Sequence, residues 1–128
     1  MREVQVHTAA GKFGQKIQIG PHVLASDEPK DEFGDDTGPV PHELLLAALG
    51  SCTSMTVKLY ADRKEWPLEA VHVRLNGRHE EGGFLIERTL VVSGALTDEQ
   101  KARLVEIAEK CPVAKTLKGT IQIATVLG

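Results

Sequence analysis

The feature that most constrains the fold of this chain is an uncharged run from Leu44 to Val57, LLLAALGSCTSMTV. Its apolar residues occupy every side of a 3.6-residue period, which predicts a helix that is buried all round. The helix is expected from about Pro41 to Lys64, because proline suits a first turn and Trp66-Pro67 ends the pattern. A domain of 128 residues has difficulty enclosing such a helix, so a partner chain could cover its exposed side.

The same run argues against a membrane protein. It is shorter than the roughly 20 residues that a membrane-spanning helix needs. The N-terminal segment MREVQVHTAAGKF has charges and alternation where a signal peptide would have an apolar core. We therefore expect a cytoplasmic protein without a membrane partner. The net charge of -3 lacks the basic stripe that nucleic acids usually require, so no nucleic-acid partner is expected either.

Short alternating segments and turn residues surround the central helix. The predicted elements are, in order, strands at 2–7, 15–19 and 22–26, the central helix, strands at 68–78 and 84–92, a helix opened by a capping box of Thr97 and Gln100 and interrupted at Cys111-Pro112, and a final strand at 120–126. Tight turns between successive strands predict antiparallel pairing. The fold class is therefore α+β, in a single domain that spans residues 1–128.

The two cysteines, Cys52 and Cys111, differ in their predicted surroundings. Cys52 lies in the middle of the apolar helix, where burial would raise the pKa of a thiol. Cys111 precedes Pro112 and would stand at the N-terminal end of a new helical turn, flanked by Lys110 and Lys115, which favours a thiolate. From the residues alone, two buried free thiols and a redox pair both remain open. None of the five histidines is spaced from another as zinc ligands are, so no metal is expected.

Two segments resemble the OsmC/Ohr family, named after osmotically inducible protein C and organic hydroperoxide resistance protein. They are the helix from Glu43 to Tyr60 with the following ADRKEWPLEAVHV, and EKCPVAKTLKGTIQIATV near the C-terminus. The chain is most similar to the OsmC-like branch. The resemblance implies an intertwined homodimer in which antiparallel sheet wraps around the two cysteine-bearing helices.

The resemblance also implies a reaction. Cys52 would be the peroxidatic residue of a thiol-dependent peroxidase, and Cys111 would resolve its sulfenic acid as a Cys52–Cys111 disulfide. The substrate would be a small apolar organic hydroperoxide, and the reductant a lipoyl-linked or thioredoxin-like dithiol. No metal or organic cofactor is implied. Leu45, Leu49 and Met55 could form an apolar substrate pocket, or they could be core.

The chain departs from the peroxidase branch at two positions. That branch uses an arginine of its N-terminal strands to hold the reactive cysteine as a thiolate, yet no arginine occurs between Arg2 and Arg63. It also has a carboxylate ten residues before that cysteine, where this chain has His42, followed by Glu43. Both are candidate supporting residues, although Glu43 could simply complement the helix dipole and His42 could be an exposed helix-end residue.

These departures keep two other functions open. One is a non-enzymatic OsmC-like module that binds an apolar ligand or partner. The other is a redox sensor whose disulfide forms with negligible turnover. The enzyme predicts a basic residue within hydrogen-bonding reach of the Cys52 sulfur, and the binding module predicts none.

Overall fold

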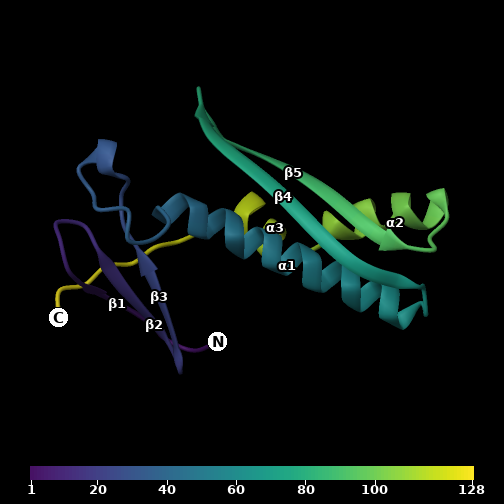
Figure 1. The fold of residues 1–128 in the computed structure, drawn as a ribbon, viewed down its shortest axis with the longest axis horizontal. Coiled ribbons are helices and arrows are strands. Elements are labelled where there is room, and N and C mark those ends of the chain that lie inside the picture. The colour runs from purple at the N-terminus through teal and green to yellow at the C-terminus, as the bar shows by residue number, and fades with distance from the viewer. The chain divides into compact units, whose positions relative to one another are not determined.

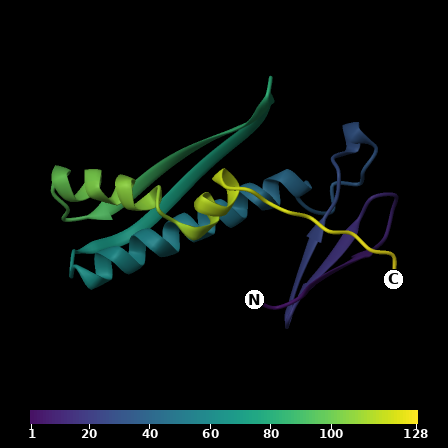
Figure 2. The same cartoon turned by 180° about the vertical axis from the view of Figure 1, so that it is seen from behind.

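Antiparallel strands and α-helices alternate in the computed structural model, which describes residues 1–128 (Figure 1; the reverse view is Figure 2). The elements are β1 (Val4–Thr8), β2 (Gln15–Ile19), β3 (His22–Ser26), the 3-10 turn η1 (Lys30–Glu32), α1 (Pro41–Arg63), β4 (Leu68–Glu80), β5 (Gly83–Gly94), α2 (Asp98–Ala108) and α3 (Pro112–Lys118). The predicted α+β class is confirmed. The chain divides into two compact units, residues 1–45 and 46–128, and the single domain stays a prediction.

The first unit contains a three-stranded antiparallel sheet in the order β1-β2-β3. Val6 pairs with Ile17, and Ile17 in turn pairs with Leu24, so apolar side chains meet across all three strands. Gly11 supplies a positive φ of 76° in the turn after β1, where a side chain would be strained. The predicted hairpin and the predicted bounds of the third strand are confirmed.

A single buried carboxylate organises the loop that follows β3. Asp27 is 2% exposed. It accepts hydrogen bonds from the Thr37 hydroxyl at 2.6 Å and from the backbone N–H groups of Glu28, Asp35 and Thr37 at 2.7, 3.3 and 3.1 Å. The hydrogen bonds from the Thr37 hydroxyl and the Glu28 N–H are the main causes that hold the pKa of Asp27 below its usual value. The loop is therefore ordered by charge-assisted hydrogen bonds.

Local hydrogen bonds define both ends of helix α1, and the sequence predicts only part of them. At its start, the Glu43 carboxylate accepts the Val40 N–H at 2.8 Å. At its end, Glu65 adopts a left-handed φ of 57°, and the Trp66 N–H then bonds to the Ala61 carbonyl at 2.9 Å. The predicted helix is confirmed to within one residue.

The chain by itself does not enclose α1, in agreement with the difficulty expected from its length, and burial all round by a partner chain stays a prediction. The buried residues of α1 form a single stripe: Leu49, Gly50, Thr53, Val57 and Ala61. Outside that stripe Met55 is 71% exposed and Leu59 is 51% exposed. By length and composition alone α1 could cross a membrane, a property that core helices of soluble proteins share. The apolar face opposite the stripe has no cover within this chain.

The long β4–β5 hairpin of the second unit packs on the buried stripe of α1 (Figure 1). Gly50 permits the close approach, because a Cβ atom at this position would lie 2.8 Å from the Cδ1 atom of Leu75 on β4. Beyond it, Val57 and Ala61 form a core with Leu104 of α2, against which Leu90 of β5 packs. The stripe thus brings α1, the hairpin and α2 into one apolar cluster.

The C-terminal part of the chain confirms one prediction and corrects another. Thr97 and Gln100 form the predicted capping box, with reciprocal hydrogen bonds of 3.1 and 2.9 Å. The predicted final strand at Thr120–Val126 is wrong for this chain, because the segment pairs with no strand and Ile123 is 86% exposed. An alternating sequence supplies the side chains of a strand, but the strand also needs a neighbouring edge.

The buried carboxylate yields a pH prediction. The folded pKa of Asp27 lies below its ordinary value of 3.8, so its stabilisation is present above that value and is lost as the pH falls through the folded pKa. We expect Asp27→Asn to lower the free energy of unfolding at neutral pH, and the deficit relative to wild type to shrink as the pH falls below the ordinary value. Urea unfolding over a pH series measures this, with the exposed Asp31→Asn as control. A deficit that is independent of pH would contradict it.

Candidate functional site

One of the two thiols, that of Cys111, lies at the N-terminal end of α3. Cys111 is the residue before the helix, in extended conformation at φ -65° and ψ 142°, and Pro112 is the first helical residue. This confirms the break predicted from the Cys-Pro sequence, since a residue before proline avoids helical geometry. The side chain of Cys111 is fully buried, in a cluster with Leu49 of α1 and Ala114 of α3. A thiol at this point is enclosed by protein on every side.

The second thiol reaches the same cluster from α1. Cys52 is partly exposed and packs against the cluster that contains Cys111. Its sulfur lies 3.5 Å from the backbone N–H of Val113, which donates from the first turn of α3. The side chain of Cys52 is also one of the groups that lower the pKa of Cys111. The structure therefore brings together two free thiols that are 59 positions apart in the numbering, one of them accessible and the other enclosed.

A guanidinium group that the sequence reasoning missed lies beside the enclosed thiol. Arg88 on β5 has a side chain that is only 12% exposed. Its Nη1 donates to the Thr53 hydroxyl at 2.9 Å and lies 3.8 Å from the Cys111 sulfur. The sequence predicts an arginine partner for Cys52 and only Lys110 and Lys115 beside Cys111, whereas the structure places Arg88 beside Cys111.

Thr53 links the helix to this guanidinium. Its hydroxyl is fully buried and donates to the Leu49 carbonyl one turn back, at 2.7 Å. The same oxygen lies 3.7 Å from the Cys111 sulfur, where either atom could be the donor. A hydroxyl has a single proton, so Thr53 can serve either the carbonyl or the sulfur at a given moment. Its spacing of four residues from both Leu49 and Val57 puts it on the stripe that faces the hairpin.

These contacts determine the acidity of the Cys111 thiol. Burial is the largest influence and raises its pKa, since a thiolate is poorly solvated there. Hydrogen bonds from the Ala114 N–H, Thr53, Cys52 and Arg88 act in the opposite direction, and together they bring the pKa of Cys111 below its ordinary value.

The outer half of the Arg88 guanidinium takes part in a surface ion-pair network. Its Nη2 donates to Glu109 Oε1 at 3.2 Å, and Lys118 Nζ donates to Glu109 Oε2 at 2.7 Å. The Lys118 ammonium is the main cause that lowers the pKa of Glu109. Both outer partners are more than half exposed, so these ion pairs add little stability. They give the outer arm of the guanidinium an anionic partner at the surface.

The other predicted site residues lie in different settings. Leu49 is core, packed in the cluster with Cys111. Met55 is exposed and therefore does not share the buried face of Leu49. His42 and Glu43 are exposed in the first turn of α1, where Glu43 bonds to Val40, and Leu45 is 37% exposed. The structure thus joins Cys52, Cys111 and Leu49, and it does not join Leu49 and Met55 into a pocket wall.

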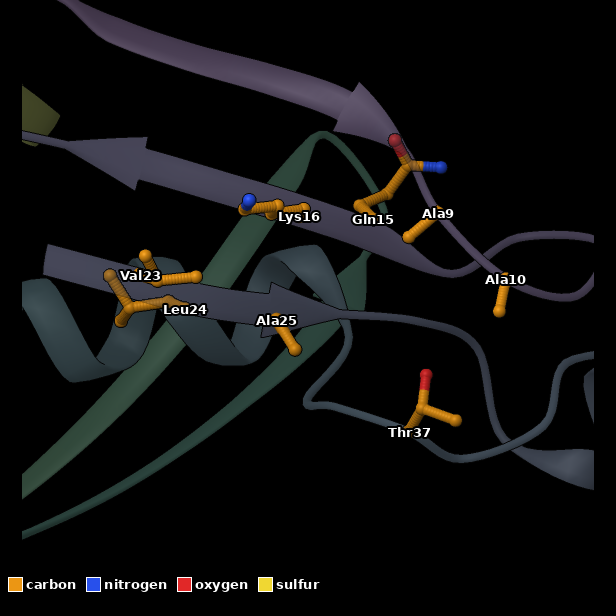
Figure 3. A pocket seen from close by; sticks show the side chains of 8 residues that line it. All are labelled: Ala9, Ala10, Gln15, Lys16, Val23, Leu24, Ala25 and Thr37. Atoms are coloured by element: carbon orange, nitrogen blue, oxygen red, sulfur yellow. The ribbon is translucent and has the colours of Figure 1, made fainter.

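A hollow of about 390 Å³ lies over the three-stranded sheet of the first unit (Figure 3). Thr37 borders it, but its hydroxyl already donates to Asp27. The lining contains no thiol and no acid; it consists of Ala9, Ala10, Gln15, Lys16, Val23, Leu24, Ala25 and Thr37. We therefore assign the candidate redox chemistry to the thiol cluster of the second unit.

A signal for Arg88 was present in the sequence. In the strand FLIERTLVV, alternate residues Ile86, Arg88 and Leu90 point to one face, and all three are partly buried. An arginine within an otherwise apolar period-two face indicates a polar partner beneath the sheet. The alternation within the strand does not identify the polar partner of Arg88, because Thr53 and Cys111 lie in two other segments of the chain.

The difference in access yields a labelling prediction. We expect iodoacetamide to modify Cys52 in the folded protein well before Cys111, because the Cys111 sulfur has no contact with solvent even though its surroundings favour the thiolate. Peptide mass spectrometry over a time course measures the two rates, and the denatured protein, in which both thiols are accessible, is the control. Faster modification of Cys111 in the folded state would show that this enclosure opens readily.

Comparisons with known proteins agree with this architecture. The model of the OsmC family, described as OsmC-like protein, matches residues 34–126. The fold is similar to that of the OsmC-like protein of Mycoplasma pneumoniae, with a TM-score of 0.79 and 17% identity over 93% of this chain and 88% of the other. It is also similar to the organic hydroperoxide resistance protein OhrB of Bacillus subtilis, with a TM-score of 0.61 and 24% identity over 93% and 91% of the two chains.

A third similar structure is the organic hydroperoxide resistance protein OsmC of Legionella pneumophila, with a TM-score of 0.66 and 18% identity over 93% of this chain and 90% of the other. A search of curated proteins gives no match. The family match covers both cysteine-bearing helices and the hairpin between them. On this evidence the chain belongs to the OsmC family of OsmC-like proteins.

Proposed function

We propose that this protein is a thiol-dependent peroxidase that reduces small organic hydroperoxides to alcohols. The observation that carries the proposal is the pairing of an accessible thiol, Cys52, with an enclosed thiol, Cys111, in one cluster. Family membership supports a redox role in general, and two similar structures are named as organic hydroperoxide resistance proteins. A pair of neighbouring free thiols can pass between dithiol and disulfide without a metal or organic cofactor.

In the proposed reaction the Cys52 thiolate attacks the distal oxygen of the hydroperoxide. The O–O bond breaks, the sulfur becomes a sulfenic acid, and the departing alkoxide takes a proton to leave as the alcohol. The Cys111 thiolate then attacks the oxidised sulfur, the S–O bond breaks, and the hydroxide leaves as water after taking a proton. A dithiol reductant, lipoyl-linked or thioredoxin-like, reduces the disulfide and restores both thiols.

The access and surroundings of Cys52 support these two roles, whereas its donor is a backbone N–H group and not the basic residue that the peroxidase predicts; the basic side chain, Arg88, lies beside Cys111. Cys52 is the thiol with access to solvent, so it is the one that a substrate can reach. The Val113 N–H donates to its sulfur and can stabilise negative charge there. Leu49 and Leu75, which pack in the same cluster, make the surroundings apolar and suit an organic substituent better than water. We assign no catalytic part to His42 or Glu43.

The peroxidase proposal has a direct test. We expect wild type to consume cumene hydroperoxide faster than hydrogen peroxide with lipoamide as reductant, because an apolar surround favours the organic peroxide. Cys52→Ser should abolish the reaction, since it removes the attacking sulfur. Cys111→Ser should retain the first oxidation and accumulate a Cys52 sulfenic acid. Stopped-flow kinetics and trapping with dimedone measure these steps, with Ser54→Ala on the same helix as control.

The opposite results distinguish the alternatives. Turnover no faster than that of a free thiol, with both cysteines unreactive, would move the function to a ligand-binding module. A reversible Cys52–Cys111 disulfide that forms slowly, without turnover, would favour a redox sensor.

We also propose that two copies of the chain associate. The support is the apolar surface that a single chain leaves uncovered, on α1 at Met55 and Leu59 and in the terminal segment at Ile121 and Ile123. Exposure of this much adjoining apolar side-chain surface on one helix is unfavourable in water. A second copy that buries α1 and pairs with the terminal segment would remove this exposed apolar surface from water. We also propose that the protein is located in the cytoplasm.

Association can be tested at Met55. A second copy that covers α1 would bury this side chain, so Met55→Glu should place a charge in the interface and dissociate the dimer. Sedimentation equilibrium measures the mass of each variant, with Lys58→Glu, exposed on the same helix, as control. A wild type that sediments as a monomer at micromolar concentration would refute the proposal.

A further inference from the structure

The stability of the fold does not explain why the charged guanidinium of Arg88 is buried. Its side chain is 12% exposed, and the guanidinium carries a permanent charge. Burying such a charge is unfavourable unless it is paired. On the solvent side its Nη2 meets Glu109. On the inner side its Nη1 meets Thr53 and the Cys111 sulfur, neither of which is charged when the thiol is protonated.

The inner arm of the guanidinium therefore lacks an anion unless Cys111 is ionised. The distance of 3.8 Å between Nη1 and the sulfur is within the range of a hydrogen bond to sulfur. Thr53 can turn its single hydroxyl proton from the Leu49 carbonyl toward the same sulfur. A negative sulfur at this position would thus receive donors from two elements, β5 and α1.

The charged and titratable groups at the sulfur and at its guanidinium partner come from four parts of the chain, while β4 contributes the apolar Leu75 to the same cluster. They are Cys52 on α1, Arg88 on β5, Glu109 after α2 and Lys118 at the end of α3. Glu109 is the only acid among them, and it is already engaged by both Arg88 and Lys118. Its negative charge is therefore largely offset, and the inner arm of Arg88 stays available to Cys111.

We propose that Arg88 is a positioning residue for the resolving thiol: it keeps the Cys111 sulfur ionised and directed at Cys52, so that the disulfide closes without a prior proton loss. This inference rests on the proposed peroxidase function and deepens it. The step transfers an electron pair from the Cys111 thiolate to the oxidised Cys52 sulfur. The S–O bond breaks, and hydroxide leaves and is protonated by solvent to water. The organic hydroperoxide has already supplied the oxidising equivalent.

Electrostatic assistance by a guanidinium is therefore expected at the resolving thiol and not at the peroxidatic one. Arg88 acts on the second thiol, so its removal should slow disulfide formation more than the oxidation of Cys52. A resolving thiol that is already ionised closes the disulfide quickly and limits overoxidation of the sulfenic acid. The rate of closure should then be nearly independent of pH around neutrality.

The first experiment titrates Cys111 without any peroxide. In a Cys52→Ser background, the ultraviolet absorbance of the thiolate is followed against pH with and without Arg88→Met. Loss of one charge-assisted hydrogen bond should reduce the thiolate-to-thiol ratio at neutral pH by about tenfold. Arg88→Lys should restore part of it, since an ammonium keeps the charge and loses the fork. The matched control is Arg78→Met, an exposed guanidinium on the same hairpin that pairs with Glu80 and Glu87.

The second experiment follows a single turnover with cumene hydroperoxide and no reductant. In Arg88→Met we expect disulfide formation at neutral pH to slow by about tenfold, and its rate to rise about tenfold per pH unit until the thiol ionises. Cys52 sulfenic acid should accumulate and be trapped by dimedone. A pH profile of this form is not produced by a loss of packing alone.

The outcomes separate the inference from the proposed function. An unchanged Cys111 titration in folded Arg88→Met, or slower Cys52 oxidation with unchanged closure, would overturn the inference. If wild type does not react with peroxide but the titration shifts as expected, the peroxidase proposal fails and the hold of Arg88 on Cys111 stands. Should Arg88→Met not fold, judged by circular dichroism, Thr53→Val removes the second donor with little change in volume. It should reduce the thiolate-to-thiol ratio in the same direction and by less, and no change would again overturn the inference.

Discussion

The packing of one stripe of α1 against the β4–β5 hairpin is the contact on which the second unit depends. Gly50 lets Leu75 approach the helix, and Thr53, three residues further on, meets Arg88 of β5. The apolar and polar parts of the contact are therefore consecutive on the same helical face. A side chain at position 50 would require the Leu75 side chain to move, and Leu75 packs in the cluster that contains the thiols. Stability and redox chemistry here share a single interface.

The two thiols are distinguished by their settings, although both are cysteines of the same cluster. Cys52 extends from the middle of a helix, where its accessibility depends on what covers that helix. Cys111 precedes a proline, so its backbone leaves helical geometry and its side chain turns into the protein. Burial alone would make it inert, and donors from three elements reverse that tendency. The proposed roles follow from this difference in burial: Cys52 attacks the peroxide, and Cys111 closes the disulfide.

Local signals in the sequence predicted much of the fold. The capping box at Thr97, the break at Cys111-Pro112 and the extent of α1 depend on residues close together in the chain, and each is confirmed. The prediction of a final strand at 120–126 is wrong, because a strand must pair with the edge of a neighbouring strand and the local sequence pattern does not show whether one is present. The single chain buries only one stripe of α1, as its length led us to expect, and the local pattern does not show what covers the opposite face.

The candidate site was predictable only in part. Family resemblance selected Cys52 and Cys111, and the structure brings them into one cluster. Arg88 and Thr53 were missed because their relation is long-range: they are 35 residues apart, on a strand and a helix. The alternation of β5 marked Arg88 as inward-facing but could not name its partner. Polar groups buried by tertiary contacts are the part of a site that a single sequence reveals least.

The two arms of the Arg88 guanidinium differ in their exposure to the surrounding electrolyte. Glu109 and Lys118 lie at the surface, where dissolved ions screen their attraction over about 8 Å at physiological ionic strength. The inner arm meets Thr53 and Cys111, which are fully buried and which mobile ions do not reach. A rise in salt therefore loosens the outer arm and leaves the inner one in place. The protein keeps the electrostatic surroundings of its enclosed sulfur nearly constant while the ionic strength of its medium changes.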